Sequence, residues 1–297
     1  MAKATGFICL LCLAQHKINC QELEPRAYAA LPKDLNAIVF AYGFSKGNVL
    51  NDPSRPIKDL SITANNFAAG YLHTFGLAGK LARVQVTVPF MLLAGHAELN
   101  GRDTSASRTG FGDARIRLGI NLTGIAAMGK REFAQYTQRT IVGVSLIMTV
   151  PTGLYLKEKL INIGSNRWAF KPEIGVSKRI KRVYVEAYGG VWFYTINHEY
   201  LGDNTLEQKP VFSFQVHASY YFKNKMMVSI NTTWFNGGTT TIGGRPAGDL
   251  VDNWRVGATW ALPIAKQQTI KLQFHIGAYT SSGYDYNVAV LGYQYLF

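Results

Sequence analysis

Alternation of apolar and polar residues recurs from about residue 34 to the C-terminus, and it limits the fold more than any other feature. In the stretch 210–222, Phe212, Phe214 and Val216 share one face of an extended strand, while Ser213 and Gln215 share the other. The same period returns, strongly or weakly, in 34–45, 59–75, 82–90, 113–122, 138–150, 166–178, 182–194, 225–235, 253–262, 269–279 and 287–297. This pattern predicts an all-β protein of about twelve strands, each about ten residues long, which suits a tilted crossing of a bilayer.

The connections between these strands alternate in length. Counted from the N-terminus, the odd-numbered ones are long and polar: GNVLNDPSRPIKD, AGHAELNGRDTSASR, GLYLKEKLINIGS, NHEYLGDNTLEQ and NGGTTTIGGRPAGDL. Most even-numbered ones are short: GLAGK, IKR, KNK and PIAK. Long connections on one side and short turns on the other are typical of antiparallel up-and-down outer-membrane barrels. The stretch 124–138 departs from this rule, and we expect it to hold a short helix.

The last strand ends on Phe297 with no polar tail, and its row Leu291, Tyr293, Tyr295 is apolar. As the free edge of a soluble sheet it would promote aggregation, whereas in a closed barrel it pairs with the first strand and faces lipid. Val288, Val290 and Leu296 would then point inward, where polar residues are the norm. The alternative is a soluble β-sandwich or lipocalin-like barrel, but its solvent face would need more Lys and Glu than these strands carry.

The N-terminus resembles a secretory signal. Lys3 precedes the apolar run 6–14, which is too short to cross a bilayer. We expect a cleaved signal peptide over 1–20, a periplasmic segment over 21–33 and a transmembrane barrel over 34–297. Cleavage near Cys20 would also remove Cys9 and Cys12, so we interpret the CxxC spacing as neither a redox pair nor a metal site.

The formal net charge of +13 raises the question of an anionic partner. The basic residues are scattered, and no recognition helix, zinc-finger spacing or RNA-binding motif accompanies them, so we expect no nucleic acid. If the apolar rows face lipid, the opposite rows face the lumen. The candidate pore-lining residues are then Arg83, Arg115, Arg117, Lys171, Glu173, Tyr184, Glu186, Tyr188, His217, Arg255, Lys271 and His275.

Two interpretations of this lumen stay open. A surplus of Lys and Arg would favour anions in transit, or the cations pair with Glu173, Glu186 and carboxylates such as Asp113 as a structural plug. An enzyme built on the barrel would need a Ser, His and Asx in contact, and no spacing specifies one. We expect no catalytic residue, cofactor or metal, and keep a phospholipase-like enzyme and a structural barrel without transport as alternatives.

Several stretches resemble the outer-membrane family described as "Putative MetA-pathway of phenol degradation". They are 21–32, 109–122, 148–155, 160–178 and the closing strand. The resemblance implies a barrel that acts as a transporter, and it assigns no catalytic residue. Tyr293, Tyr295 and Phe297 also resemble the C-terminal signal read by the barrel-assembly machinery. We therefore expect a multi-pass barrel in the outer membrane of a Gram-negative bacterium, in contact with lipid or lipopolysaccharide, that conducts a small hydrophobic, aromatic or anionic solute.

Overall fold

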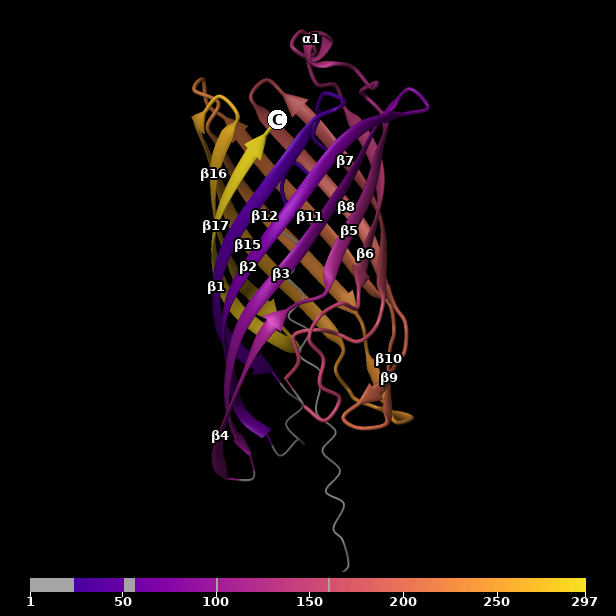
Figure 1. The fold of residues 1–297 in the computed structure, drawn as a ribbon, viewed down its shortest axis with the longest axis vertical. Coiled ribbons are helices and arrows are strands. Elements are labelled where there is room, and N and C mark those ends of the chain that lie inside the picture. The colour runs from indigo at the N-terminus through magenta and orange to yellow at the C-terminus, as the bar shows by residue number, and fades with distance from the viewer. Residues whose placement is uncertain (1–23, 51–56, 100, 160) are drawn as a thin grey trace, which may run out of the picture.

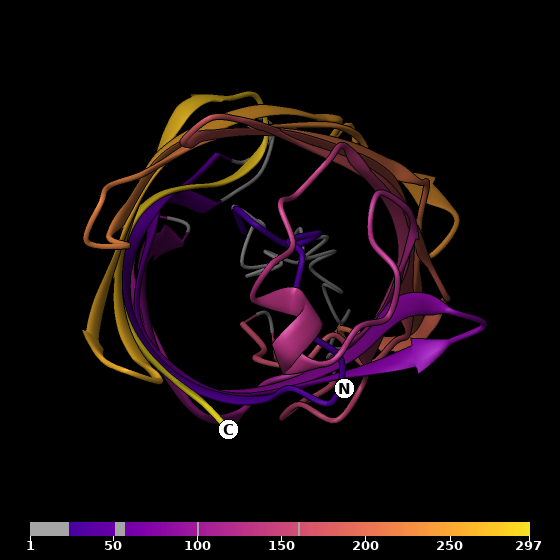
Figure 2. The same ribbon diagram turned by 90° about the horizontal axis from the view of Figure 1, so that it is seen from above.

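The computed structural model describes residues 24–50, 57–99, 101–159 and 161–297. Antiparallel strands follow one another around a central axis and form a tall barrel (Figure 1), whose wall is a closed ring when viewed along that axis (Figure 2). No helix within these ranges is long and apolar enough to cross a membrane. The predicted all-β barrel is confirmed.

In the part of the chain that the structure describes, thirteen strands make up the wall. They are β1 (Asn36–Leu50), β2 (Ile57–Leu77), β3 (Lys80–Leu99), β4 (Arg102–Phe111), β5 (Ala114–Thr123), β6 (Ile141–Val150), β7 (Ala169–Ile180), β8 (Val183–Tyr194), β11 (Val211–Tyr221), β12 (Met227–Gly237), β15 (Val251–Ala265), β16 (Gln268–Thr280) and β17 (Gly283–Leu296). Both β4 and β5 pair with β3, one after the other, and together make a single crossing. The barrel therefore has twelve crossings, as predicted.

Pairing between the first and last strands closes the ring. Tyr42 of β1 lies opposite Leu291 of β17, and β1 pairs with β2 along its other edge. Beyond the strand, Asn36 and Phe297 exchange backbone hydrogen bonds of 3.1 and 2.9 Å. The aromatic end of the chain is thus part of a continuous ladder, and the exposed edge that a soluble sheet would have does not exist here.

Large apolar side chains cover the outside of the wall. Ile230 is 74% exposed while the next residue, Asn231, is 1% exposed; Phe274 and His275 show the same contrast at 57% and 8%. A water-soluble protein rarely exposes so much contiguous apolar surface, whereas acyl chains solvate it at no cost. The β-sandwich alternative is wrong, because it would place these apolar rows inside.

Smaller elements decorate the two ends. A short helix, α1 (Lys130–Phe133), lies in the stretch 124–138, as predicted, at the same end as the C-terminus (Figure 1). The other end carries a second sheet built from the long connections: β9 (Asn197–Tyr200), β10 (Asn204–Gln208), β13 (Thr240–Ile242) and β14 (Arg245–Pro246). We call these the α1 end and the loop end.

One sector of the wall near the loop end has no complete ladder. Among the described strands, β4 pairs with β3 alone, and β6 pairs with β5 but not with β4. The connection between β6 and β7 runs along this sector, where the Leu154 amide donates to the Phe111 carbonyl at 2.8 Å. The Asp113 carboxylate accepts from the backbone amides of Gly153 (2.9 Å) and Ser165 (2.8 Å) and so anchors the connection.

The segment before β1 lies inside the barrel. Side chains and backbone groups of residues 24–33 contact the inner wall, and the Asp34 amide donates to the Thr74 carbonyl at 2.8 Å. The sequence predicts a separate periplasmic segment over 21–33. From residue 24 onward the hydrogen-bonding partners of this segment are inward-facing strand residues and residues of the connection before β6, so the described part lies against the barrel wall. The predicted signal peptide lies outside the described residues.

Candidate functional site in the barrel lumen

The structure places all twelve sequence-predicted residues at inner-wall positions. Nine are buried, and Arg115, Tyr184 and Lys271 are half-buried. The alternation of each strand explains this placement, because outward positions would put charges against acyl chains. That these residues line a solute path stays a prediction.

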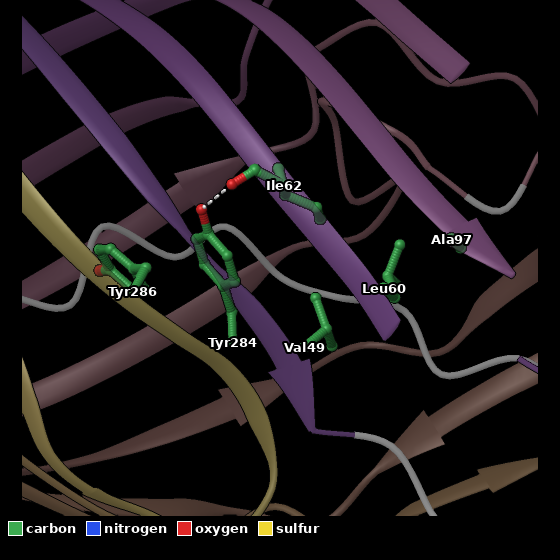
Figure 3. Packing of buried hydrophobic residues seen from close by; sticks show 6 residues of the cluster. All are labelled: Val49, Leu60, Ile62, Ala97, Tyr284 and Tyr286. Atoms are coloured by element: carbon green, nitrogen blue, oxygen red, sulfur yellow. Dashed lines mark hydrogen bonds between the residues drawn. The ribbon is translucent and has the colours of Figure 1, made fainter. Parts of the chain in front are cut away.

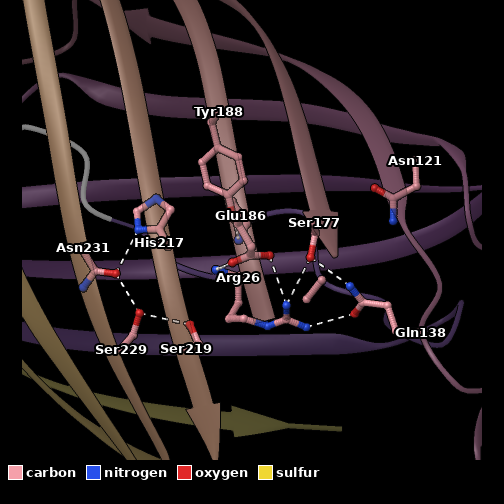
Figure 4. Close-up of polar contacts among 12 residues, drawn as sticks. Arg26, Asn121, Gln138, Ser177, Glu186, Tyr188, His217, Ser219, Ser229 and Asn231 are labelled. Carbon is pink, nitrogen blue, oxygen red and sulfur yellow. Dashed lines mark hydrogen bonds and ion pairs between the residues drawn. The ribbon is translucent and has the colours of Figure 1, made fainter. Parts of the chain in front are cut away.

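Glu186 of β8 is occupied by the N-terminal segment. The Arg26 guanidinium donates from Nη1 to Glu186 Oε1 at 3.1 Å, and the Arg26 amide donates to Glu186 Oε2 at 2.7 Å (Figure 4). The same guanidinium reaches Gln138 Oε1 at 3.1 Å and Ser177 Oγ at 3.2 Å, and it lies 3.9 Å from the ring centroid of Tyr184. One arginine thus joins β7, β8 and the connection before β6.

Tyr28 occupies a slot made by two glycines. Gly143 of β6 pairs with Gly175 of β7, and neither has a side chain to fill the inner face. A Cβ on Gly143 would lie 2.6 Å from Tyr28 Cδ1, and one on Gly175 would overlap the ring. At the end of the slot the phenol lies 2.9 Å from Ser145 Oγ and donates to Glu173 Oε1 at 3.1 Å. Burial and the Glu173 charge raise the pKa of Tyr28 to about 12.

Arg83 holds the same segment from a third side. Its guanidinium donates to the carbonyls of Ala27 (2.7 Å) and Ala29 (2.9 Å). Residues 26–29 are therefore fixed to β3, β6, β7 and β8 together. The alternation of apolar and polar residues predicts that Arg83, Tyr188 and Glu186 face the lumen. Nothing in the sequence indicates that their partners come from residues 26–29. Glycines occur in strands for several structural reasons. The slot at Gly143 and Gly175 therefore cannot be recognised until the pairing of β6 with β7 is known.

Glu173 is the centre of a buried charge cluster. It accepts from Arg117 Nη2 at 2.8 Å and from Lys171 Nζ at 2.6 Å, and Arg117 also lies 3.6 Å from Glu24. The predicted pairing of lumen cations is confirmed for Glu173, whereas Glu186 pairs with Arg26 of the N-terminal segment; that these pairs plug the lumen stays a prediction. The predicted pairing is wrong for Asp113, whose carboxylate accepts from backbone amides of the β6–β7 connection instead.

A second polar cluster follows β11 and β12. His217 Nδ1 lies 2.9 Å from Asn231 Oδ1, Ser229 donates to the same oxygen at 2.8 Å, and Ser219 donates to Ser229 at 3.0 Å (Figure 4). His217 Nε2, the atom that would activate a nucleophile, has no hydrogen-bonding partner in the described chain. The serines bond the amide and each other, so the cluster is not arranged as a Ser-His-Asn triad.

Toward the loop end the lumen wall becomes apolar. One cluster on β1, β2, β3 and β17 contains Val49, Leu60, Ile62, Ala97, Tyr284 and Tyr286 (Figure 3). Another on β6, β7, β8, β11 and β12 contains Ile147, Ala169, Trp192, Val211 and Phe235. Val288 packs against the first cluster, which explains why an inward-facing row of the last strand is apolar. The predicted inner face is polar over only part of its height.

The barrel fold agrees with the family that a comparison of sequences identifies. The sequence profile of the family described as "Putative MetA-pathway of phenol degradation" matches residues 43–287. The chain belongs to this family. The match begins within β1 and ends within β17, so it covers most of the barrel wall and confirms the predicted resemblance. No curated protein sequence matches the chain.

Solved structures of outer-membrane barrels have the same fold as this family member. An outer membrane channel from Pseudomonas putida F1 is 20% identical, with a TM-score of 0.80 over 93% of this chain and 100% of that chain. The transport unit of the autotransporter AIDA-I from Escherichia coli is 10% identical, with a TM-score of 0.56 over 95% and 94%. The beta domain of the Bordetella autotransporter Brka is 9% identical, with a TM-score of 0.54 over 89% and 100%.

Proposed function

We propose that the protein is an outer-membrane channel through which a small solute crosses by diffusion or facilitated uptake. The observation that carries this proposal is the inversion of the barrel: apolar side chains cover its outside, and polar and charged side chains gather inside it. A closed barrel with this distribution is suited to a bilayer and encloses a route across it. The channel from Pseudomonas putida F1, which shares the fold, supports the same role.

The inner wall suggests what kind of solute fits. Apolar clusters near the loop end offer contacts to a hydrophobic or aromatic body, while Arg83, Arg117, Lys171 and Arg255 make the interior cationic. Residues 26–29 extend from the wall into the lumen and narrow it on one side. The solute is therefore small, and it carries apolar surface, negative charge or both.

The apolar outer surface of the barrel suggests how the protein inserts into a membrane and what it contacts there. The outward belt, which includes Phe40, Phe212 and Leu291, would contact lipid and lipopolysaccharide in a Gram-negative outer membrane. Tyr293, Tyr295 and Phe297 would present the assembly signal to the barrel-assembly machinery. The proposal needs no nucleotide, metal or covalent chemistry, and no nucleic acid.

Planar-bilayer recording tests the proposal against its alternatives. The mature protein, refolded in detergent and inserted into a lipid bilayer, is expected to give discrete conductance steps and a measurable preference between anions and cations. An insulating protein that releases fatty acid from phospholipid would favour the enzyme. An insulating protein without hydrolysis would favour a structural barrel, and either result would refute the channel.

A further inference from the structure

Arg255 of β15 differs from Arg26, Arg83 and Arg117 in its partners. Its side chain is 1% exposed, Nη2 donates to the Tyr286 carbonyl at 2.7 Å, and its Cζ lies 3.8 Å from the Tyr286 ring centroid. The other two nitrogens, Nε and Nη1, have no hydrogen-bonding partner among the described residues. Buried guanidinium nitrogens are normally satisfied, so two unsatisfied ones point to a group that binds there.

The contrast with neighbouring cations is clear. Arg26, Arg117 and Lys171 each contact a glutamate, and Arg83 donates to two carbonyls of the N-terminal segment. Arg255 forms no ion pair with a carboxylate in the described part of the chain. The nearby Asp285 accepts from Thr280 Oγ1 at 3.2 Å instead. Arg255 is thus a buried positive charge with no described carboxylate at ion-pair distance, although the Asp285 carboxylate occupies the inner face at Gly277, the residue opposite Arg255 on β16.

His275 of β16 lies diagonally across from Arg255. The register pairs Arg255 with Gly277 and Gly257 with His275, so the two side chains share the inner face, and each faces a glycine on the adjacent strand. Diagonal neighbours in a sheet are about 7–8 Å apart, within reach of one small ligand. His275 is 8% exposed, and its Nε2 has no hydrogen-bonding partner in the described ranges. A neutral imidazole can present an N–H at that atom.

An apolar surface adjoins these donors. Tyr286, on which the guanidinium lies, stacks on Tyr284 with ring centroids 4.4 Å apart, and both belong to the cluster of Val49, Leu60 and Ile62 (Figure 3). A ligand bound to Arg255 and His275 would lay any apolar part against this cluster. Inorganic anions and neutral apolar compounds would each use only half of such a site.

We infer that Arg255 and His275 form an anion-binding site in the lumen, and that the solute of this channel is a small carboxylate on an apolar body. The carboxylate accepts hydrogen bonds from Arg255 and His275, and the body packs beside Tyr284 and Tyr286. This inference rests on the proposed channel function and narrows it to one chemical class of solute.

Block of the ion current by cyclohexanecarboxylate tests the inference. A bound solute obstructs the lumen, so the wild-type chloride current should fall with its concentration, while cyclohexanecarboxamide and acetate at the same concentrations leave the current nearly unchanged. Replacing Arg255→Gln should raise the half-blocking concentration about tenfold or more, as expected for loss of charge-assisted hydrogen bonds.

Lys271→Gln is the matched control. Lys271 is also a lumen cation on β16, roughly 13 Å along the strand from His275 at about 3.3 Å per residue. Its replacement removes the same charge, so it should change ion selectivity but leave the half-blocking concentration within about threefold, which is less than 1 kcal/mol. Equal weakening by both replacements would reduce the effect to general electrostatics and overturn the site.

The outcomes separate the two claims. A wild-type protein that inserts without conducting refutes the channel itself. A conducting protein with the same half-blocking concentration in wild type and Arg255→Gln refutes only the anion site. Should Arg255→Gln fail to form a barrel that migrates as folded on an unheated gel, His275→Asn takes its place. Weaker block in that variant supports the site, and unchanged block overturns it.

Discussion

The ring of Tyr28 fills the space that a side chain on Gly175 would need, so that a Cβ built on this glycine overlaps the ring. Gly143, paired with Gly175 across β6 and β7, clears the other half of the slot. The hydroxyl of Tyr28 then reaches Ser145 and Glu173. One aromatic side chain, inserted between two strands at their glycines, thereby positions the segment that narrows the lumen.

Gly175→Ala is expected to expel Tyr28 and widen the channel. The added methyl group overpacks the slot at a cost of about 1–3 kcal/mol, which favours undocking of residues 26–29. Single-channel conductance should rise, and Tyr28→Ala should raise it similarly. Because both replacements act on one contact, the double variant should conduct like either single variant.

Gly189→Ala is the control for this prediction. Gly189 of β8 lies opposite Ile174, and a Cβ there would meet only Phe214, at an ordinary 3.9 Å. Its conductance should equal that of the wild type. An unchanged conductance in Gly175→Ala and Tyr28→Ala would mean that the segment does not restrict the current.

Docking of the segment should weaken at high pH. The pKa of Tyr28 is about 12 when docked and about 10 when exposed. Docking is therefore at full strength below pH 10. It weakens between pH 10 and 12, because only the undocked phenol releases its proton there, by about 1.4 kcal/mol per pH unit.

Conductance recorded at pH 8 and pH 11 checks this effect. The undocking equilibrium constant of the wild type should be about tenfold larger at pH 11 than at pH 8, so its conductance should increase. Tyr28→Phe keeps the ring but cannot ionise, so it controls for the titration of lysines and other tyrosines. Equal responses in the two proteins would show that another group controls the change.

The sequence predicted the barrel well because alternation is a local property. In β11 and β12 each residue's side is set by its parity, and a slip of one residue would turn Phe214 inward and Gln215 into lipid. The N-terminal segment has no such constraint. Arg26 and Tyr28 find partners more than a hundred residues away, through a register that only the closed barrel defines. The apolar clusters of the lumen could not be predicted for a related reason. Apolar residues on both faces of β17 leave undecided which face points inward.

Glu173→Gln should destabilise the barrel by about 3–5 kcal/mol, the usual cost of breaking a buried ion pair. This replacement removes the carboxylate that both Arg117 and Lys171 contact, while both cations stay in the wall. Samples are heated to increasing temperatures before electrophoresis, and the temperature at which the folded band disappears measures the loss of stability. Glu207→Gln, in β10 outside the lumen, serves as a control and should leave this temperature unchanged. A similar temperature in the two variants would show that the charge cluster contributes little.

Phe297→Ser should lower the amount of barrel assembled in cells without lowering the stability of the barrel that forms. The Phe297 side chain is 45% exposed and stacks on Tyr295, with ring centroids 5.9 Å apart, whereas its backbone exchanges hydrogen bonds with Asn36 beside the closing β1–β17 pair. Serine keeps that backbone, so the stability change should stay within about 0.5 kcal/mol, as for other surface replacements.

Phe222→Ser is the matched control: Phe222 is 39% exposed, follows β11 at the α1 end, and is internal to the chain. Outer-membrane fractions should contain less of the Phe297 variant than of the Phe222 variant, while both purified proteins unfold at the same temperature. If the two variants accumulate equally, Phe297 is not read as an assembly signal, and its aromatic ring serves only as part of the lipid-facing surface.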